Sequence, residues 1–257
     1  MSRPPAEIIV DSTPQSGRFN MAMDEALLEF GAERSCCVVR IYEWAEPTVT
    51  LGYFQGSTSA STRPASVDSL RGLPVVRRLS GGGAILHDRE LTYSCVVPAS
   101  HPVRHDPSEL YTLVHEQLIR LLAECNVPAT LRCDFKVRSD AEQRQAVVGD
   151  SAAAEPFLCF LRSNPNDIVH ASGAKIVGSA QRRRKGVILQ HGSLLLAESV
   201  AAKGIRGIRE LSLEFDESRF RRELPVSVAA AVSDNWTLRA YTQDELHRCD
   251  QLQLPTD

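Results

Sequence analysis

The sequence predicts an α+β (mixed α/β) fold, because three features of the chain agree. Short runs rich in β-branched and aromatic residues dominate the middle of the 257 residues, and amphipathic helical patterns flank them. Hydrophobic residues make up 43% of the chain, which is enough for one sizeable core, and we find no internal repeat. We therefore expect one domain over residues 1–257, with a core at about 8–200 and a helical C-terminal extension at about 200–257.

The N-terminal part of the chain predicts one helix followed by a series of strands. The helix lies in NMAMDEALLEFG, and Gly31 provides its stop. Its apolar face consists of Met23, Ala26, Leu27 and Phe30. The runs CVVRIYEW and TVTLGYF then predict two strands joined by a turn, and PVVRRLS predicts a third strand that ends at a glycine triplet. Two further short strands follow in AILH and LTYSCVVP.

A second helix is predicted after these strands. Asp106 is a suitable cap, Pro107 suits the first turn, and Glu109 stands three residues after the cap. An apolar stripe follows at helical spacing, formed by Leu110, Val114, Leu118 and Leu121. Asn126 is a suitable terminator, so we expect the helix to end there.

The remainder of the chain predicts a loop, a hairpin and a helical tail. Residues 139–156 are small, polar and without periodicity, which indicates a surface loop. The runs AKIVGSAQ and GVILQHGSLLL predict two strands of a hairpin joined through RRRKG. From about Ser199 the chain is charged and helical in pattern, and Thr242 and Glu245 have the spacing of a capping box.

Composition argues against several classes of function. A net charge of −3, with 24% charged residues, gives no support for nucleic-acid binding. No run approaches the roughly 18 apolar residues of a membrane helix, and the first residues lack a signal-peptide pattern. The seven cysteines are irregularly spaced and contain no CxxC pair, so we expect reduced thiols in a cytoplasmic protein and no zinc site.

The glycine triplet in RRLSGGGAILH is the first candidate for function. It lacks the lysine and hydroxyl residue of a P-loop, and the chain contains no GxGxxG fingerprint. Glycines at a strand end allow backbone amides to approach a ligand, and Arg77 and Arg78 add positive charge beside them. Three interpretations remain open, namely a loose turn, a phosphate cradle and a tunnel wall that lies flat against a ligand.

Lys175 and Cys159 are candidates for chemistry, each with a structural alternative. Lys175 alternates with apolar residues on a predicted strand, so it either faces water or holds a positive charge at a cleft beside Gly178 and Ser179. Cys159 follows the predicted loop, so it is either a small buried residue or a reactive thiol at a loop edge.

The histidines and the basic run are weaker signals. His87, His170 and His191 do not have metal-ligand spacing, so we expect no metal site, and His191 is expected to make a structural hydrogen bond or to line the cleft. The run from Arg182 to Lys185 is either a solvated hairpin tip or a surface that attracts an acidic partner.

Two motifs in a fixed order resemble the biotin/lipoate protein ligase superfamily. They are RRLSGGGAILHDRELTYS and, later in the chain, GAKIVGSAQRRRKGVILQHGSLLL. NMAMDEALL and RIYEWAEPTVTLGYFQ are similar to the same family, and the resemblance covers roughly residues 8–200. It implies a biotin/lipoate ligase-like catalytic domain, in which helices flank a mixed, largely antiparallel β-sheet.

The resemblance also implies roles for individual residues. Lys175 matches the lysine that contacts the acyl carbonyl, and Gly81–Gly83 match the loop that lines the acyl tunnel. The pair Cys159–Phe160 stands sixteen residues before Lys175 and is similar to the pair that carries the acyl-accepting cysteine in the cysteine-dependent octanoyl-[acyl carrier protein]:protein octanoyltransferases. The implied substrate-binding residues are Arg77, Ser80, Gly81, Gly82, Gly83, Ala84, His87, Gly178, Ser179, Ala180, His191 and Gly192.

The function implied is an acyl transfer of lipoate biosynthesis. Octanoyl would move from octanoyl-acyl carrier protein through a Cys159 thioester to a lysine of a lipoyl domain, in a glycine cleavage H protein or a 2-oxoacid dehydrogenase E2, by a monomer that needs no cofactor. The alternatives are a lipoate–protein ligase that uses ATP and Mg, an amidotransferase acting between lipoyl domains, and a protein that binds acyl groups without catalysis. No nucleic-acid or membrane partner is expected.

Overall fold

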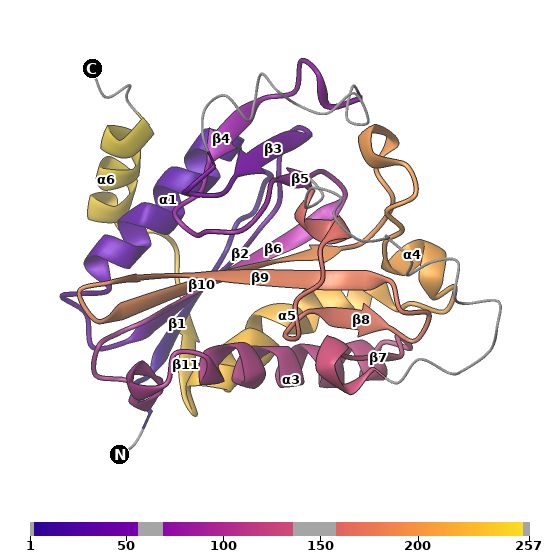
Figure 1. The fold of residues 1–257 in the computed structure, drawn as a ribbon. Helices are drawn as coiled ribbons and strands as arrows, with labels where there is room; N and C mark the ends of the chain where they lie inside the picture. The colour runs from indigo at the N-terminus through magenta and orange to yellow at the C-terminus, as the bar shows by residue number, and fades with distance from the viewer. Residues whose placement is uncertain (1–2, 56–68, 136–157, 254–257) are drawn as a thin grey trace.

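The computed structural model describes residues 3–55, 69–135 and 158–253, and its centre is an eight-stranded sheet (Figure 1). The strand order is β11–β1–β2–β6–β10–β9–β8–β7. These strands are β1 (Ala6–Val10), β2 (Cys37–Tyr42), β6 (Glu90–Val97), β7 (Ala129–Leu131), β8 (Ile168–His170), β9 (Lys175–Arg184), β10 (Val187–Leu195) and β11 (Trp236–Leu238). Strand β1 runs parallel to β2 and β11, and the other neighbouring pairs are antiparallel. The predicted mixed, largely antiparallel sheet is therefore confirmed.

Helices cover both faces of this sheet. Helices α1 (Gly17–Phe30) and α6 (Gln243–Gln253) pack together on one face, and α3 (Glu109–Glu124) and α5 (Glu217–Val232) pack together on the other (Figure 1). A second sheet, in the order β4–β3–β5, lies on the α1 side. Its strands are β3 (Thr48–Leu51), β4 (Val75–Arg77) and β5 (Ile85–His87). The remaining short helices are η2 (Pro102–His105), η3 (Arg132–Asp134), η5 (Cys159–Leu161), η6 (Val200–Ala202) and α4 (Ile208–Leu211).

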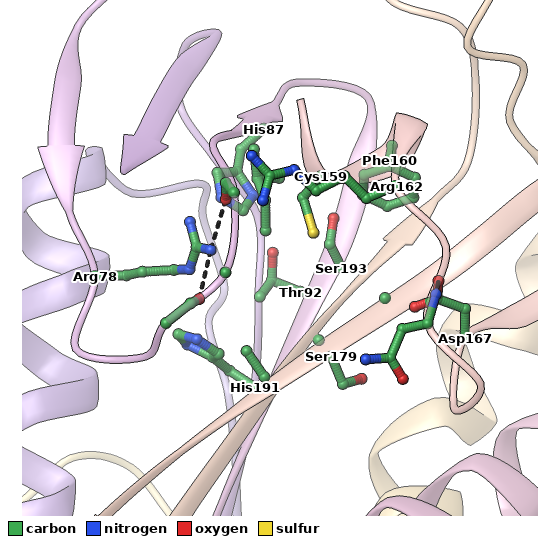
Figure 2. Close-up of a pocket in the computed structure, with 18 of the residues that line it drawn as sticks. Arg78, His87, Thr92, Cys159, Phe160, Arg162, Asp167, Ser179, His191 and Ser193 are labelled. Carbon is green, nitrogen blue, oxygen red and sulfur yellow. Dashed lines mark hydrogen bonds between the residues drawn. The ribbon is translucent and has the colours of Figure 1, made fainter. Parts of the chain in front are cut away.

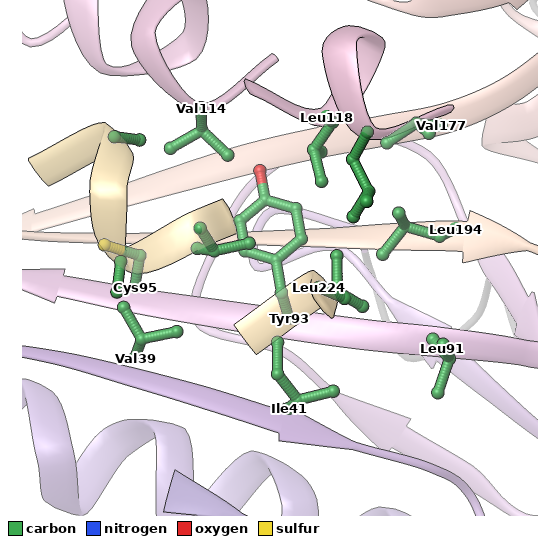
Figure 3. Packing of buried hydrophobic residues seen from close by; sticks show 14 of the residues in the cluster. Val39, Ile41, Leu91, Tyr93, Cys95, Val114, Leu118, Val177, Leu194 and Leu224 are labelled. Atoms are coloured by element: carbon green, nitrogen blue, oxygen red, sulfur yellow. The ribbon is translucent and has the colours of Figure 1, made fainter. Parts of the chain in front are cut away.

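Alternation along the central strands separates the main core from the face that α1 covers. On β6, Leu91, Tyr93 and Cys95 belong to the large apolar cluster that also contains residues of α3 and α5 (Figure 3). Successive side chains of a strand point to opposite faces, so Thr92 and Ser94 of β6 point to the other face. The same strand therefore supplies core residues on one side and buried polar residues on the other.

Most of the predicted helix ends agree with the structure. Helix α1 ends at Gly31, Asn126 ends α3 with a left-handed φ of 64°, and the Thr242–Glu245 capping box is formed with reciprocal hydrogen bonds of 2.8 and 3.2 Å. The predicted Asp106 cap is wrong. The α3 helix begins only at Glu109, and the Asp106 carboxylate accepts a hydrogen bond from the Ser108 amide in the preceding turn.

Four strands were not evident from the sequence. Strands β7, β8 and β11 have three residues each, and β1 precedes the first predicted helix. Because β11 pairs in parallel with β1, the segment predicted as a helical extension also supplies an edge of the central sheet. The predicted loop at 139–156 lies outside the described residues. Among the helices of the described ranges, none has the length and apolar character to cross a bilayer.

We expect Gly31→Ala to destabilise the fold by about 1–3 kcal/mol, because an added methyl group would overpack the contact of α1 with the sheet. A Cβ atom at Gly31 would lie 2.7 Å from Cγ1 of Val96 and 2.8 Å from Cγ1 of Val187. Urea unfolding measures the effect. The control is Gly81→Ala, whose new Cβ would meet only Phe54, at 4.0 Å, among the residues that the structure describes. Equal stability of the two variants would contradict the packing argument.

Candidate active site

One pocket of about 410 Å³ collects most of the predicted functional residues (Figure 2). Its walls come from β2, β5, β6, β9 and β10, from the glycine triplet and from the turn that begins at Cys159. The predicted site residues that line it are Gly81, Gly82, Gly83, His87, Cys159, Lys175, Gly178, Ser179, Ala180, His191 and Gly192. Segments that are far apart in the sequence therefore meet around a single cavity.

The main chain of Cys159 is fixed to the strand that follows the glycine triplet. Its amide donates a hydrogen bond of 2.7 Å to the carbonyl oxygen of Ala84, and Leu158 forms a parallel β-bridge with the same residue. The half-buried side chain directs Sγ into the pocket, toward Thr92 and Ser193 (Figure 2). The thiol is therefore held at a loop edge and is open to a ligand.

The Lys175 side chain is buried and lies beside the same turn. Nζ is 2.9 Å from Oδ1 of Asp167 and donates a hydrogen bond of 3.3 Å to the carbonyl oxygen of Cys159. Burial raises the pKa of the Asp167 carboxyl, and the adjacent Lys175 opposes that shift. A Cβ at Gly178 would come within 2.7 Å of Cε of Lys175, so the glycine leaves room for the lysine side chain.

A β-bulge determines where Lys175 points. Lys175 pairs with Val169 and Val177 pairs with Ile168, so Ile176 is the extra residue on β9. Ile176 and Val177 consequently both join the main core, and Lys175 faces the pocket. A regular strand would place Lys175 on the same face as Val177.

The glycine triplet accommodates two arginine side chains. A Cβ at Gly82 would lie 3.0 Å from Nη2 of Arg78, and one at Gly83 would lie 2.7 Å from Cζ of Arg162. Nη2 of Arg78 donates hydrogen bonds of 2.7 Å to the carbonyl oxygens of Gly81 and Gly83, and Gly82 has a left-handed φ of 95°. Within the described residues, the space left by the missing side chains of Gly82 and Gly83 therefore faces guanidinium groups.

A buried polar network forms another wall of the pocket. Nδ1 of His87 is 2.6 Å from Oε1 of Glu90, and the His87 ring stacks on Trp44 at 3.9 Å. The hydroxyl groups of Thr92 and Ser193 donate hydrogen bonds to the Glu90 carboxylate. These contacts hold His87 in one orientation. Across the described ranges, no three His, Cys, Asp or Glu side chains are grouped as a metal site requires.

His191 is fixed by partners on two other elements. Nε2 lies 2.5 Å from the hydroxyl of Ser80, and Nδ1 lies 3.1 Å from Oδ2 of Asp24 on α1. Burial acts to raise the pKa of Asp24, but His191 and Arg40 outweigh it and hold that pKa below its usual value. The structural hydrogen bond and the cleft position predicted for His191 are both present.

Ser179 belongs to a hydrogen-bond chain whose direction is determined by its ends. Nδ1 of His115 donates to the carbonyl oxygen of Asn166 at 2.6 Å, and burial lowers the pKa of His115 to about 4. Nε2 of the neutral ring therefore accepts from the Ser179 hydroxyl at 2.7 Å, and Ser179 in turn accepts from Tyr93 at 2.8 Å. A Cβ at Gly192 would lie 2.4 Å from the Ser179 hydroxyl oxygen, so this glycine makes room for the chain.

Three predicted substrate-binding residues do not line the pocket. Arg77 is exposed, and its guanidinium group donates hydrogen bonds to the carbonyl oxygens of residues 52, 53 and 55. Ser80 is buried against His191, and Ala84 lines a separate small cavity and accepts the Cys159 amide. Arg77 and Ala84 therefore shape the surrounding backbone, and Ser80 orients His191.

The pocket also contains residues that sequence reasoning missed as site residues. They include Arg162, Asp167 and Trp44, together with Arg78, which was expected only to add positive charge beside the glycine triplet. Strand alternation was a usable signal for Arg78, because Arg77 and Arg78 must point to opposite sides. Asp167 lies in a turn without periodicity, so no pattern in the sequence identified it as the partner of Lys175.

A thiol, an ammonium group and guanidinium groups share one pocket, and these groups are suited to acyl chemistry. The family model for the lipoyl protein ligase A/B catalytic domain matches residues 16–233. The chain belongs to this family.

Sequence relatives give a finer placement. Octanoyltransferase LipM of Lysinibacillus sphaericus is 36% identical over 219 residues, which cover 84% of this chain and 74% of that protein. Octanoyltransferase LipM of Kyrpidia tusciae is 41% identical over 183 residues, which cover 70% of this chain and 62% of that protein. These similarities place the chain among the protein octanoyltransferases of the family.

Solved structures confirm the predicted ligase-like fold. A structure of lipoate-protein ligase A bound with ATP has a TM-score of 0.69 and 21% identity, and the match covers 97% of this chain and 94% of that one. A bi-partite lipoate protein ligase from Thermoplasma acidophilum has a TM-score of 0.67 and 19% identity, with 98% and 92% covered. At these identities the likeness concerns the fold alone.

We expect His115→Gln to weaken the dependence of folding stability on pH. The folded-state pKa of about 4 lies below the unfolded value of 6.5, so the stability that neutral His115 contributes is complete above 6.5 and is lost as the pH falls toward 4. Between pH 7.5 and 5 this loss amounts to about 2 kcal/mol, and the variant lacks it. Urea unfolding across this range measures it, with exposed His247→Gln as the control. Parallel pH profiles for wild type and His115→Gln would contradict the assignment.

Proposed function

We propose that this octanoyltransferase moves octanoyl from octanoyl-acyl carrier protein to a lysine of a lipoyl domain through a thioester on Cys159. The observation that carries the proposal is the position of Cys159, whose sulfur enters the pocket while its carbonyl oxygen lies 3.3 Å from Nζ of Lys175. A nucleophile and a cation are thus adjacent at one cavity, as covalent acyl transfer requires. The octanoyltransferase relatives support the identity of the acyl group.

The first step exchanges one thioester for another. The thiolate of Cys159 attacks the carbonyl carbon of the donor, the bond from that carbon to the phosphopantetheine sulfur breaks, and the leaving thiolate takes up a proton. Negative charge develops on the carbonyl oxygen during the attack, and Lys175 is the group we assign to it. Because the acyl group is already activated as a thioester, the step needs no ATP and no cofactor.

The second step forms an amide. The acceptor amine attacks the Cys159 thioester, the bond from carbon to Sγ breaks, and the proton lost by the amine restores the thiol. The lipoyl domain is the proposed acceptor, in a glycine cleavage H protein or an E2 subunit. The product amide is more stable than the thioester it replaces, so the overall transfer is downhill.

The cavity is suitable for a medium-length acyl chain. Its apolar lining includes Met21, Tyr42, Trp44 and Ile85. Burial of the seven saturated carbons of octanoyl contributes about 5–6 kcal/mol of gross affinity, part of which is offset by the ordering of the chain. We propose this wall as the acyl site.

A ligase activity is the second candidate, because the fold matches that of a lipoate-protein ligase bound with ATP. In a ligase the acyl group would be activated as an adenylate, and Cys159 would have no covalent role. An amidotransferase would use an acyl-lipoyl domain as donor, and a protein that only binds acyl groups would give no product. These activities differ in the donor they need.

We expect Cys159→Ser to lower transfer from octanoyl-carrier protein to an apo lipoyl domain without ATP by more than about a hundredfold, because serine is a far weaker nucleophile at neutral pH. Intact-mass analysis of the acceptor measures the product. When the acceptor is left out, we expect an octanoyl adduct on Cys159 of the wild-type protein. The matched control is Cys133→Ser, which changes an exposed cysteine outside the pocket. Activity only with octanoate and ATP, unchanged by Cys159→Ser, would replace the proposal by the ligase.

We also propose that the tip of the β9–β10 hairpin meets an acidic partner. Arg183, Arg184 and Lys185 are all exposed, and Arg184 pairs with Glu25 and Glu29 at 3.5 and 3.3 Å. Strand β9 has ten residues, so its tip lies about 30 Å from Lys175, which is within the span of a small domain.

Arg183→Glu with Lys185→Glu should therefore slow turnover mainly at low salt, because exposed charges are screened as ionic strength rises. Steady-state rates across a salt series measure this. The control is Arg104→Glu with Arg120→Glu, which changes the net charge equally at exposed positions of η2 and α3. If both pairs show the same salt dependence as wild type, the hairpin tip is not the docking surface.

A further inference from the structure

Arg78 is a buried cation whose hydrogen bonds all go to uncharged groups. Only 2% of the residue is exposed. Nη1 donates to the carbonyl and hydroxyl oxygens of Thr50 at 3.2 Å, and Nη2 donates to the carbonyl oxygens of Gly81 and Gly83 at 2.7 Å. Nε is buried and has no hydrogen-bond partner among the described residues. Part of the guanidinium group is therefore unused.

Lys175, one of the other cations that line the pocket with Cys159, is in a different state. The Lys175 ammonium group has a carboxylate partner, Asp167, at 2.9 Å, so its charge is largely compensated within the fold. Arg78 has no carboxylate partner within the described residues. Burial lowers the pKa of Arg78 to about 10, and the nearby Cys159 acts in the opposite direction, so Arg78 stays protonated at neutral pH.

A buried charge without a counter-charge is costly, so its persistence points to an anion that forms or arrives beside it. Main-chain hydrogen bonds connect Cys159 to the segment that Arg78 binds. Arg78 binds the carbonyl oxygen of Gly83, and Cys159 donates its amide to the carbonyl oxygen of the next residue, Ala84. Arg78 and Cys159 also line the same cavity (Figure 2).

We propose that Arg78 is the cation that stabilises the thiolate of Cys159, while the Lys175–Asp167 pair serves the acyl oxygen. This rests on the proposed covalent function of Cys159. The thiol gives its proton to water before the attack, Arg78 balances the resulting charge, and the charge moves to the carbonyl oxygen when the new carbon–sulfur bond forms.

Alkylation by iodoacetamide tests the proposal without an acyl substrate. Only the thiolate reacts appreciably, and peptide mapping by mass reads Cys159 and the exposed Cys133 in the same sample. In wild-type protein at neutral pH, Cys159 should react faster than Cys133 although it is less exposed. In Arg78→Gln the Cys159 rate should fall by about tenfold or more, with the Cys133 rate unchanged. Slower reaction of Cys159 than Cys133 in wild type would overturn the proposal even if Arg78→Gln fails to fold.

Two matched controls separate the effect of Arg78 from that of Arg77 and from that of the Lys175–Asp167 pair. Arg77→Gln removes the adjacent, exposed arginine and should leave the Cys159 rate within about twofold of wild type. Lys175→Gln combined with Asp167→Asn removes the ion pair without changing the net charge and should leave the rate within about threefold, although acyl transfer falls. A larger loss of alkylation in the double variant than in Arg78→Gln would assign the thiolate to Lys175 and overturn the proposal.

The variant Arg78→Lys separates the effect of the positive charge from the effect of the hydrogen bonds that Arg78 makes. Lysine keeps the charge but cannot make all four hydrogen bonds, so it should recover most of the alkylation rate if the charge is what matters. Equal loss in Arg78→Lys and Arg78→Gln would reduce Arg78 to a support of the glycine triplet.

Inorganic phosphate that binds wild type and abolishes the rate difference between wild type and Arg78→Gln would instead assign Arg78 to a phosphate-bearing ligand. The absence of an octanoyl adduct on wild-type Cys159 would defeat the proposed function but leave these alkylation results to decide the role of Arg78.

Discussion

The main chain of Cys159 is held from two directions, and the arrangement of the pocket depends on this constraint. Its amide donates to the carbonyl oxygen of Ala84 at 2.7 Å, and its carbonyl oxygen accepts from Nζ of Lys175 at 3.3 Å. Ala84 follows the glycine triplet and Lys175 begins β9, so two strands distant in the sequence are joined to one short turn. Because backbone contacts position the residue, the sulfur itself needs no structural partner and remains available for chemistry.

The central sheet gives a rigid support to the pocket beside this turn. Thr92 and Ser193 turn their hydroxyl groups to the pocket from β6 and β10, while the neighbouring Tyr93 and Leu194 pack into the main core. Gly192 leaves the space in which the Tyr93 hydroxyl meets Ser179, so a polar chain runs through the sheet next to the cavity. The polar groups that β6, β9 and β10 supply to the pocket are therefore fixed by strands, which limits their motion.

The fold class and the main elements followed from periodicity, and the two motif regions were correctly expected to meet at one site. Contacts that depend on tertiary geometry were not predictable. Alternation along a strand places the side chains of Arg77 and Arg78 on opposite faces, but the sequence alone did not show which face the pocket occupies. His115 follows Val114 of the apolar stripe, and only the packing of α3 against β9 shows that it bonds Ser179. Asp167 sits in an irregular turn, where no period exists to be read.

The extra residue at Ile176 has a consequence for how the family can change over time. A regular ladder at this point, as one added residue on β8 would give, would turn the Lys175 side chain from the pocket toward the main core while the residues of the motif stayed the same. The pairing register of β9 with β8 therefore determines which face Lys175 occupies, independently of the identity of the side chains. A descendant that lost this irregularity would keep the residues of the motif but would no longer present the Lys175 ammonium group to the pocket, and a comparison of sequences alone would not reveal the change.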